Sequence, residues 1–187
     1  MVSLTSEEAT QMLIAAQQSW KLSGLLSGSQ LAGLKGLEIV LVDLQGPTLA
    51  EVNGDSIFID ITAAGYGWFV DETPLHNEES ELKTDANLLS AEKGSDAWDR
   101  IDLLSVLLHE LGHVAGLDHD IEHTVLAPIM AENLDPGSRY MMPVALSSFV
   151  IRSKAPFWES GYGFHVSLPT IWPVSWTLFE WWLPRIN

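Results

Sequence analysis

The segment HELGHVAGLDH, residues 109–119, carries the residues with the clearest chemical pattern. His109 and His113 are four positions apart, so on a helix both imidazoles lie on one face and can reach a single metal ion. Glu110 is rotated by about 100° from His109 around the helix axis. The pattern therefore predicts a carboxylate beside a metal ion, where a general base can take a proton from a water molecule.

Gly116 and His119 extend this pattern beyond the helix. Glycine adopts a left-handed conformation without steric cost, so we expect Gly116 to end the helix and to turn His119 back toward the other two histidines. Three neutral imidazoles leave one position of a tetrahedral zinc ion open, which is typical of a catalytic zinc site. The sequence contains no cysteine, which favours zinc over copper(I) or an iron–sulfur cluster.

Other side chains close to His119 are alternative third ligands for the metal ion. These are Asp118, Asp120, Glu122 and His123. The fixed offset of His119 from the first two histidines makes it the better choice, although an aspartate or histidine could substitute for it.

A helix must position His109 and His113. We expect it to begin near Trp98, with Ser95 or Asp96 as its N-cap. The helix shows one apolar stripe, which consists of Ile101, Leu104, Leu108, Leu111 and Ala115. The stripe predicts that one side of the helix is buried in the core.

The region before this helix predicts one more helix and a small sheet. A helix capped by Ser6 runs to about Trp20, and glycines mark a loose connection after it. Strands are predicted at 37–42 and 56–61, and 65–70 is either a short third strand or an aromatic loop. The order of elements indicates an α+β domain.

Acidic residues outnumber basic ones, 25 to 9, which gives a formal net charge of −16. This charge repels nucleic acids and anionic membranes, so a nucleic-acid-binding function is excluded. Ten of the acids lie in residues 71–102. We interpret that stretch as a solvated loop, with a calcium site as the alternative.

The composition changes near Met142. Five of the eight tryptophans follow it, so we predict one domain at 1–142 and a Trp/Pro-rich extension of unknown role at 143–187. Residues 160–179 contain no Asp, Glu, Lys or Arg over the length of a membrane span. Prolines and glycines within them argue against a spanning helix, and hence against membrane contact.

The spacing of His109, Glu110, His113, Gly116 and His119 resembles the zinc signature of the metzincin metallopeptidases. Residues 37–140 are similar to matrixin-like domains of large secreted or surface proteins of bacteria. That similarity includes IDITAAGYGWFVD at 59–71 and MAENLxPG at 130–137, where x is an unspecified position.

The resemblance implies a metzincin-like fold. In it a small twisted mixed β-sheet packs on helices, and the active-site helix precedes a short C-terminal subdomain with a methionine turn. Met130 is the candidate for this turn, and we expect Asp120 to support the turn or a ligand histidine. The region before the helix is short for a five-stranded metzincin sheet.

The implied function is zinc-dependent hydrolysis of peptide bonds in polypeptide substrates. His109, His113 and His119 would bind one Zn²⁺, and Glu110 would be the general base. A substrate would add as a strand to an exposed sheet edge. The resemblance implies an extracellular or cell-surface location, although Met1 to Thr10 do not resemble a secretory signal.

The alternative function is a non-catalytic, zinc-stabilised adhesion or interaction module, or a fragment of a larger surface protein. The small sheet and the unusual C-terminal segment favour it. Glu110 counts against it, because a structural zinc site has no use for a base beside an open coordination position. No feature of the sequence indicates an oligomeric state.

Overall fold

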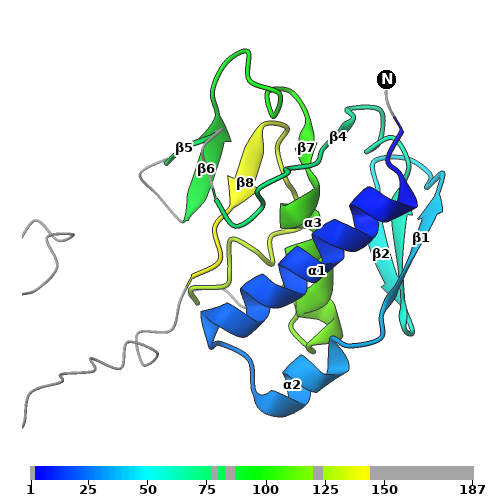
Figure 1. Cartoon of the computed structure of the whole chain (residues 1–187), viewed down its shortest axis with the longest axis vertical. Coiled ribbons are helices and arrows are strands. Elements are labelled where there is room, and N and C mark those ends of the chain that lie inside the picture. The colour runs from blue at the N-terminus through cyan, green and yellow to red at the C-terminus, as the bar shows by residue number, and fades with distance from the viewer. Residues whose placement is uncertain (1–2, 77–79, 83–86, 120–123, 144–187) are drawn as a thin grey trace, which may run out of the picture. The chain divides into compact units, whose positions relative to one another are not determined.

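The computed structural model describes residues 3–76, 80–82, 87–119 and 124–143 (Figure 1). Three helices lie in this part of the chain: α1 (Ser6–Ser23), α2 (Gly28–Gly33) and α3 (Leu103–Val114). The strands are β1 (Glu38–Val42), β2 (Ala50–Asn53), β3 (Ser56–Asp60), β4 (Trp68–Phe69), β5 (Ser80–Leu82), β6 (Leu88–Ala91), β7 (Ile101–Asp102) and β8 (Ser138–Tyr140). The predicted α+β class, a small mixed sheet packed on helices, is confirmed.

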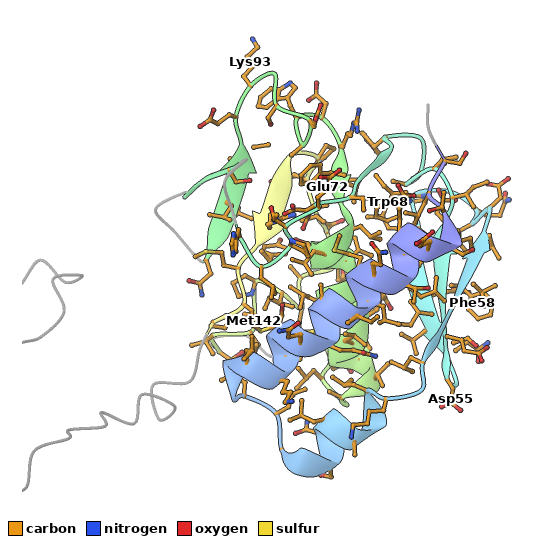
Figure 2. All side chains as sticks on the ribbon, viewed as in Figure 1. Asp55, Phe58, Trp68, Glu72, Lys93 and Met142 are labelled. Carbon is orange, nitrogen blue, oxygen red and sulfur yellow. The ribbon has the colours of Figure 1, made fainter. Side chains whose placement is uncertain are left out.

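The first sheet has the strand order β1-β3-β2. β1 runs parallel to β3, whereas β2 runs antiparallel to β3 and is joined to it by the turn at Asn53 to Asp55. Ile57 and Ile59 of β3 are fully buried. Phe58 alternates with them and is half-buried on the outer side of the sheet (Figure 2). One face of this sheet therefore packs on the helices, and β2 is an edge strand beside α3.

α1 crosses α3 and packs directly against it (Figure 1). Trp20 of α1 is fully buried, and its indole N–H donates a hydrogen bond of 3.1 Å to the carbonyl of Leu108. Met12 and Ala16 are buried in the same core. Because Leu108 directly precedes His109, α1 supports the helix at the point where the histidines begin.

Two further small sheets surround the start of α3. β4 and β7 form a parallel pair, and β5-β6-β8 form a three-stranded sheet. The prediction of a solvated loop over residues 71–102 is therefore wrong in part, since β5, β6 and β7 lie within it. β6 is stabilised by antiparallel pairing with β8, some 50 residues later in the chain. No local pattern reveals that partner.

The N-caps predicted for α1 and α3 are wrong, because the structure places each cap at a different residue. Thr5 caps α1, because its side chain accepts a hydrogen bond from the amide of Glu8. α3 begins at Leu103 rather than near Trp98, and its cap is Asp102. Trp98 lies in a turn, with its amide bonded to the carbonyl of Ser95.

The predicted loose connection after α1 contains the short helix α2. Ser27 caps it, and Ser27 and Gln30 form a reciprocal capping box. Glycines at both ends of α2 concealed this helix in the sequence, because glycine is the poorest helix former after proline.

Asp60, at the end of β3, organises the turn that leads to β4. Its carboxylate is buried and accepts hydrogen bonds from the backbone amides of Leu44, Thr62 and Ala64. Burial by itself raises the pKa of Asp60, but the hydrogen bonds together outweigh it and hold the pKa below its ordinary value. The ionised form of Asp60 therefore stabilises the fold.

Asp60→Asn should lower the free energy of unfolding at pH 7 by about 1–3 kcal/mol, because the hydrogen bonds lose a charged acceptor. A depressed folded-state pKa contributes stability above the unfolded pKa of about 3.9, and this stability is lost as the pH falls. The difference between wild type and variant should therefore shrink at pH 3. Urea unfolding at both pH values measures it, with exposed Asp55→Asn as the control. An equal difference at both pH values would contradict the assignment.

The predicted boundary between 142 and 143 falls at the end of the described residues. The extension at 143–187 and the apolar segment at 160–179 lie outside them, except for Pro143. Among the helices that the structure does describe, none has the length and apolar character needed to cross a membrane.

Candidate metal centre

The three predicted histidines converge on one point. The Nε2 atoms of His109 and His113 are 3.0 Å apart, and Nε2 of His119 lies 3.1 Å from His113 and 3.3 Å from His109. His109 and His113 are half-buried and His119 is exposed. Among described residues, these three form the one group of histidines or acids close enough to hold a metal ion.

Backbone carbonyls fix the orientation of the first two rings. Nδ1 of His109 lies 2.9 Å from the carbonyl oxygen of Ile129, and Nδ1 of His113 lies 3.0 Å from that of Leu117. A carbonyl only accepts hydrogen bonds, so each Nδ1 must carry the proton. In a neutral ring each Nε2 then presents a lone pair to the other.

This donor set fits a zinc ion. Two acceptor nitrogens at 3.0 Å repel each other unless a cation lies between them. Two bonds of about 2.05 Å to tetrahedral zinc would place the nitrogens about 3.3 Å apart, close to the observed separations. Burial is the largest cause that lowers the pKa of His109, which favours the neutral ring that a metal requires.

His119 has a different kind of partner. Its Nδ1 lies 3.5 Å from a carboxylate oxygen of Glu132, which is itself largely exposed. Asp118 instead accepts a hydrogen bond of 2.7 Å from the backbone amide of His119. Glu132 was not predicted as a site residue. Its position two residues after Met130 was the available signal.

The end of α3 turns the chain at Gly116 and brings His119 to the other two histidines, as the sequence predicts. Gly116 has a φ of +82°, and the amide of Leu117 bonds back to the carbonyl of Gly112. The side chain of Gln30 donates a hydrogen bond of 2.8 Å to the carbonyl of Ala115. α2 thus satisfies a carbonyl at the end of the histidine helix, a role for Gln30 that no sequence pattern indicated.

Met130 lies fully buried against α3. Its sulfur occupies the space that a Cβ at Gly112 would fill. The ring of Trp20 also lies within van der Waals contact, 3.6 Å, of that Cβ position. Gly112 is one residue before His113, so this close packing sets how near Met130 approaches the histidines. Gly112 occupies an unspecified position of the metzincin pattern, and no feature of the sequence indicates its role.

Gly112→Ala should lower the free energy of unfolding by about 1–3 kcal/mol, because the methyl group collides with Met130. It should also weaken zinc binding, since Met130 follows Ile129. Gly33→Ala in α2 is the matched control, because no atom lies within 4 Å of its new methyl group. Urea unfolding and chelator competition measure the two effects. Equal behaviour of both variants would show that the Gly112–Met130 contact does not matter.

Glu110 is buried, with 6% of its surface exposed. Burial, and after it the charge of Glu51 in β2, together raise its pKa to about 7. The helix that carries Glu110 lies beside β2, the edge strand of the first sheet.

Residues 54–139 match the family model of the matrixins. The similarity to matrixin-like metzincins is thus confirmed over slightly less than half of the chain. The matched residues include β3, α3 and the three histidines. No curated protein and no solved structure matches the chain.

Asp120, together with the alternative ligands Glu122 and His123, lies outside the described residues. The alternative of a calcium site is not supported. In the part of the chain that the structure describes, the acids of residues 71–102 form no group that could hold a metal ion.

Proposed function

We propose that the chain is a zinc-dependent endopeptidase. The observation that carries this proposal is the convergence of three Nε2 atoms within 3.3 Å, two of them on rings fixed by backbone carbonyls. His109, His113 and His119 would hold the ion. When bound, zinc acts as a Lewis acid that polarises the scissile carbonyl and lowers the pKa of water toward about 7.

Glu110 is proposed as the general base. Its carboxylate would take the proton of the attacking water and then deliver it to the leaving amine. A pKa of about 7 suits both steps, because the group can accept a proton and release it near neutral pH. Its burial and its neighbour Glu51 are the causes of that value.

The edge strand β2 is proposed as the binding surface for the substrate. Within the described residues β2 pairs with β3 on one side only, so its other side offers backbone N–H and C=O groups. An extended polypeptide can add there as a strand, recognised through its main chain. The charge of Glu51 reaches Glu110, which supports the proximity of this edge to the proposed base.

The segment around Met130 is proposed as the methionine turn. The amide of Met130 bonds to the carbonyl of Leu126, and the side chain lies against Gly112. Met130 would provide an apolar floor for the centre without binding the ion. The resemblance to domains of secreted and surface proteins supports an extracellular or cell-surface location as part of the proposal.

Two measurements on the purified full chain test the function. Mass spectrometry should find one zinc ion per chain, and unfolded casein should be cleaved at internal bonds. Zinc without cleavage would favour the non-catalytic interaction module. A chain that binds no zinc would contradict both functions.

A further inference from the structure

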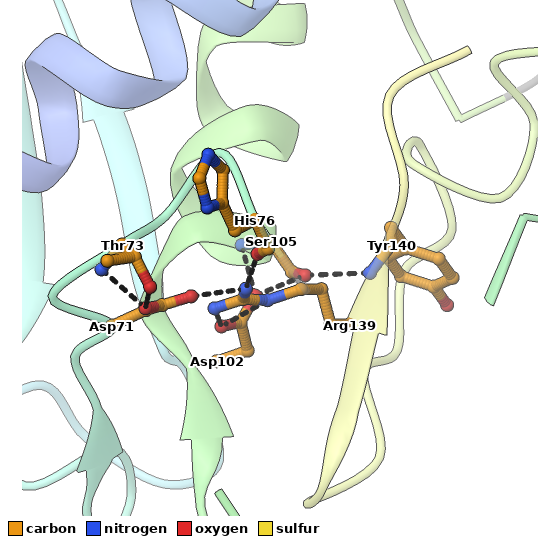
Figure 3. Close-up of polar contacts among 7 residues, drawn as sticks. All are labelled: Asp71, Thr73, His76, Asp102, Ser105, Arg139 and Tyr140. Carbon is orange, nitrogen blue, oxygen red and sulfur yellow. Dashed lines mark hydrogen bonds and ion pairs between the residues drawn. The ribbon is translucent and has the colours of Figure 1, made fainter. Parts of the chain in front are cut away.

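A buried cluster of charges lies at the start of α3 (Figure 3). Arg139 of β8 is 4% exposed and forms ion pairs with Asp71 and Asp102, which are also buried. Nε and Nη2 of Arg139 donate to the same oxygen of Asp102, at 3.0 and 2.7 Å. A third nitrogen donates to Asp71 and to the carbonyl of His76.

Asp102 serves two elements at once. Its other oxygen caps α3 by accepting hydrogen bonds from the amide and the hydroxyl of Ser105, at 2.9 and 2.6 Å. The same hydroxyl accepts a hydrogen bond of 2.9 Å from the amide of Tyr140. The start of the histidine helix and the strand β8 therefore share one polar network, one helical turn before His109.

Residues 124–137 lead from the metal centre to this network, and we call them the histidine loop. The loop contains Ile129, Met130 and Glu132, each of which contacts a histidine or the helix beneath it. At its end, the amide of Gly137 bonds to the carbonyl of Arg100. No helix or strand lies within the loop, so its position depends on these anchors.

We propose that Arg139 is a positioning residue for the histidine centre. By binding Asp71 and Asp102 it fixes the end of the histidine loop on α3, and thereby holds the carbonyl of Ile129 on Nδ1 of His109. The inference rests on the proposed zinc function. The Ile129 carbonyl is the outer partner of His109, and the loss of such a partner typically lowers metal affinity by 10–100-fold.

The charges explain why a guanidinium is needed at this position. Two buried carboxylates face one cation, and the positive end of α3 supplies the remaining compensation. Asp102 and Asp71 approach Arg139 from different segments, and the planar guanidinium can donate to both at once. An ammonium group at 139 would keep the charge but could not reproduce this fork.

Arg139→Lys tests the proposal in the full chain. We expect zinc affinity, measured by chelator competition, to fall about tenfold, and the visible absorption bands of bound Co²⁺ to shift. In the metal-free protein, amide exchange should become faster at Met130 and stay unchanged at Ala16 of α1. If the wild type binds no zinc, that result overturns only the proposed function. The exchange measurement then still tests whether Arg139 positions the histidine loop.

Ile57→Val is the matched control, because it destabilises the first sheet without contacting the charge cluster. It should lower the melting temperature and leave zinc affinity within about twofold. If Arg139→Lys does not fold, Ser105→Ala should weaken zinc binding in the same direction by removing the acceptor for Tyr140. Wild-type affinity and an unchanged Co²⁺ spectrum in the variant, or an equal loss of affinity in Ile57→Val, would overturn the proposal.

Discussion

Replacing Glu110 by alanine should lower the rate of casein hydrolysis by about 10²–10⁴-fold, while the protein keeps one zinc ion per chain. The variant lacks the carboxylate that would accept the proton of the attacking water, but it keeps all three histidines. Removing a buried acid with a raised pKa also relieves the cost of its burial, so we expect no loss of stability. Turnover and metal content are measured on the same preparations.

Glu92→Ala is the control for this experiment, because Glu92 is an exposed acid in the connection between β6 and β7. It should cleave casein like the wild type. Equal turnover in Glu110→Ala and wild type would assign the activity to another group or to a contaminant. Bound zinc with no turnover in either protein would instead favour the interaction module.

Replacing His119 by alanine should weaken zinc binding by more than about a hundredfold. The loss exceeds the 10–100-fold range of outer partners because the change removes a ligand itself. His119 is the most exposed of the three and lies beyond the helix, so the fold should tolerate its removal. Chelator competition gives the affinity, and circular dichroism confirms that the helices persist.

Two other histidines serve as controls for His119. His76→Ala changes an exposed side chain that does not belong to the histidine group and keeps its backbone carbonyl, so the variant should bind zinc like the wild type. His123→Ala tests the alternative ligand that the sequence left open. If His119→Ala kept tight zinc and His123→Ala lost it, the ligand assignment would be wrong.

The convergence of the histidines was predictable because it depends on local rules. Spacing of four on a helix brings His109 and His113 together, and the left-handed Gly116 redirects the chain toward His119. Each step involves neighbours within one or two turns. The predicted strands at 37–42 and 56–61 were likewise close to β1 and β3, because buried apolar runs of that length have few other uses.

The elements that the sequence did not reveal depend on distant partners. β6 is held by β8, and Arg139 finds Asp71 and Asp102 across 68 and 37 positions. An arginine beside Tyr140 and two methionines carries no sign that it will be buried in an ion pair. The start of α3 was misplaced because Ser95 and Asp96 are as suitable for capping as Asp102, and only the tertiary network distinguishes them.

The contact between Trp20 and Leu108 spans 88 positions of the chain, which has a consequence for the order of folding. A nascent chain releases α1 long before α3 exists, so the side of α1 that packs on α3 stays uncovered until residues near 115 leave the ribosome. The β2–β3 hairpin can form earlier, because its contacts are local. Metal uptake is then a late event of biogenesis, since the histidines gain their support only when the first helix finally docks.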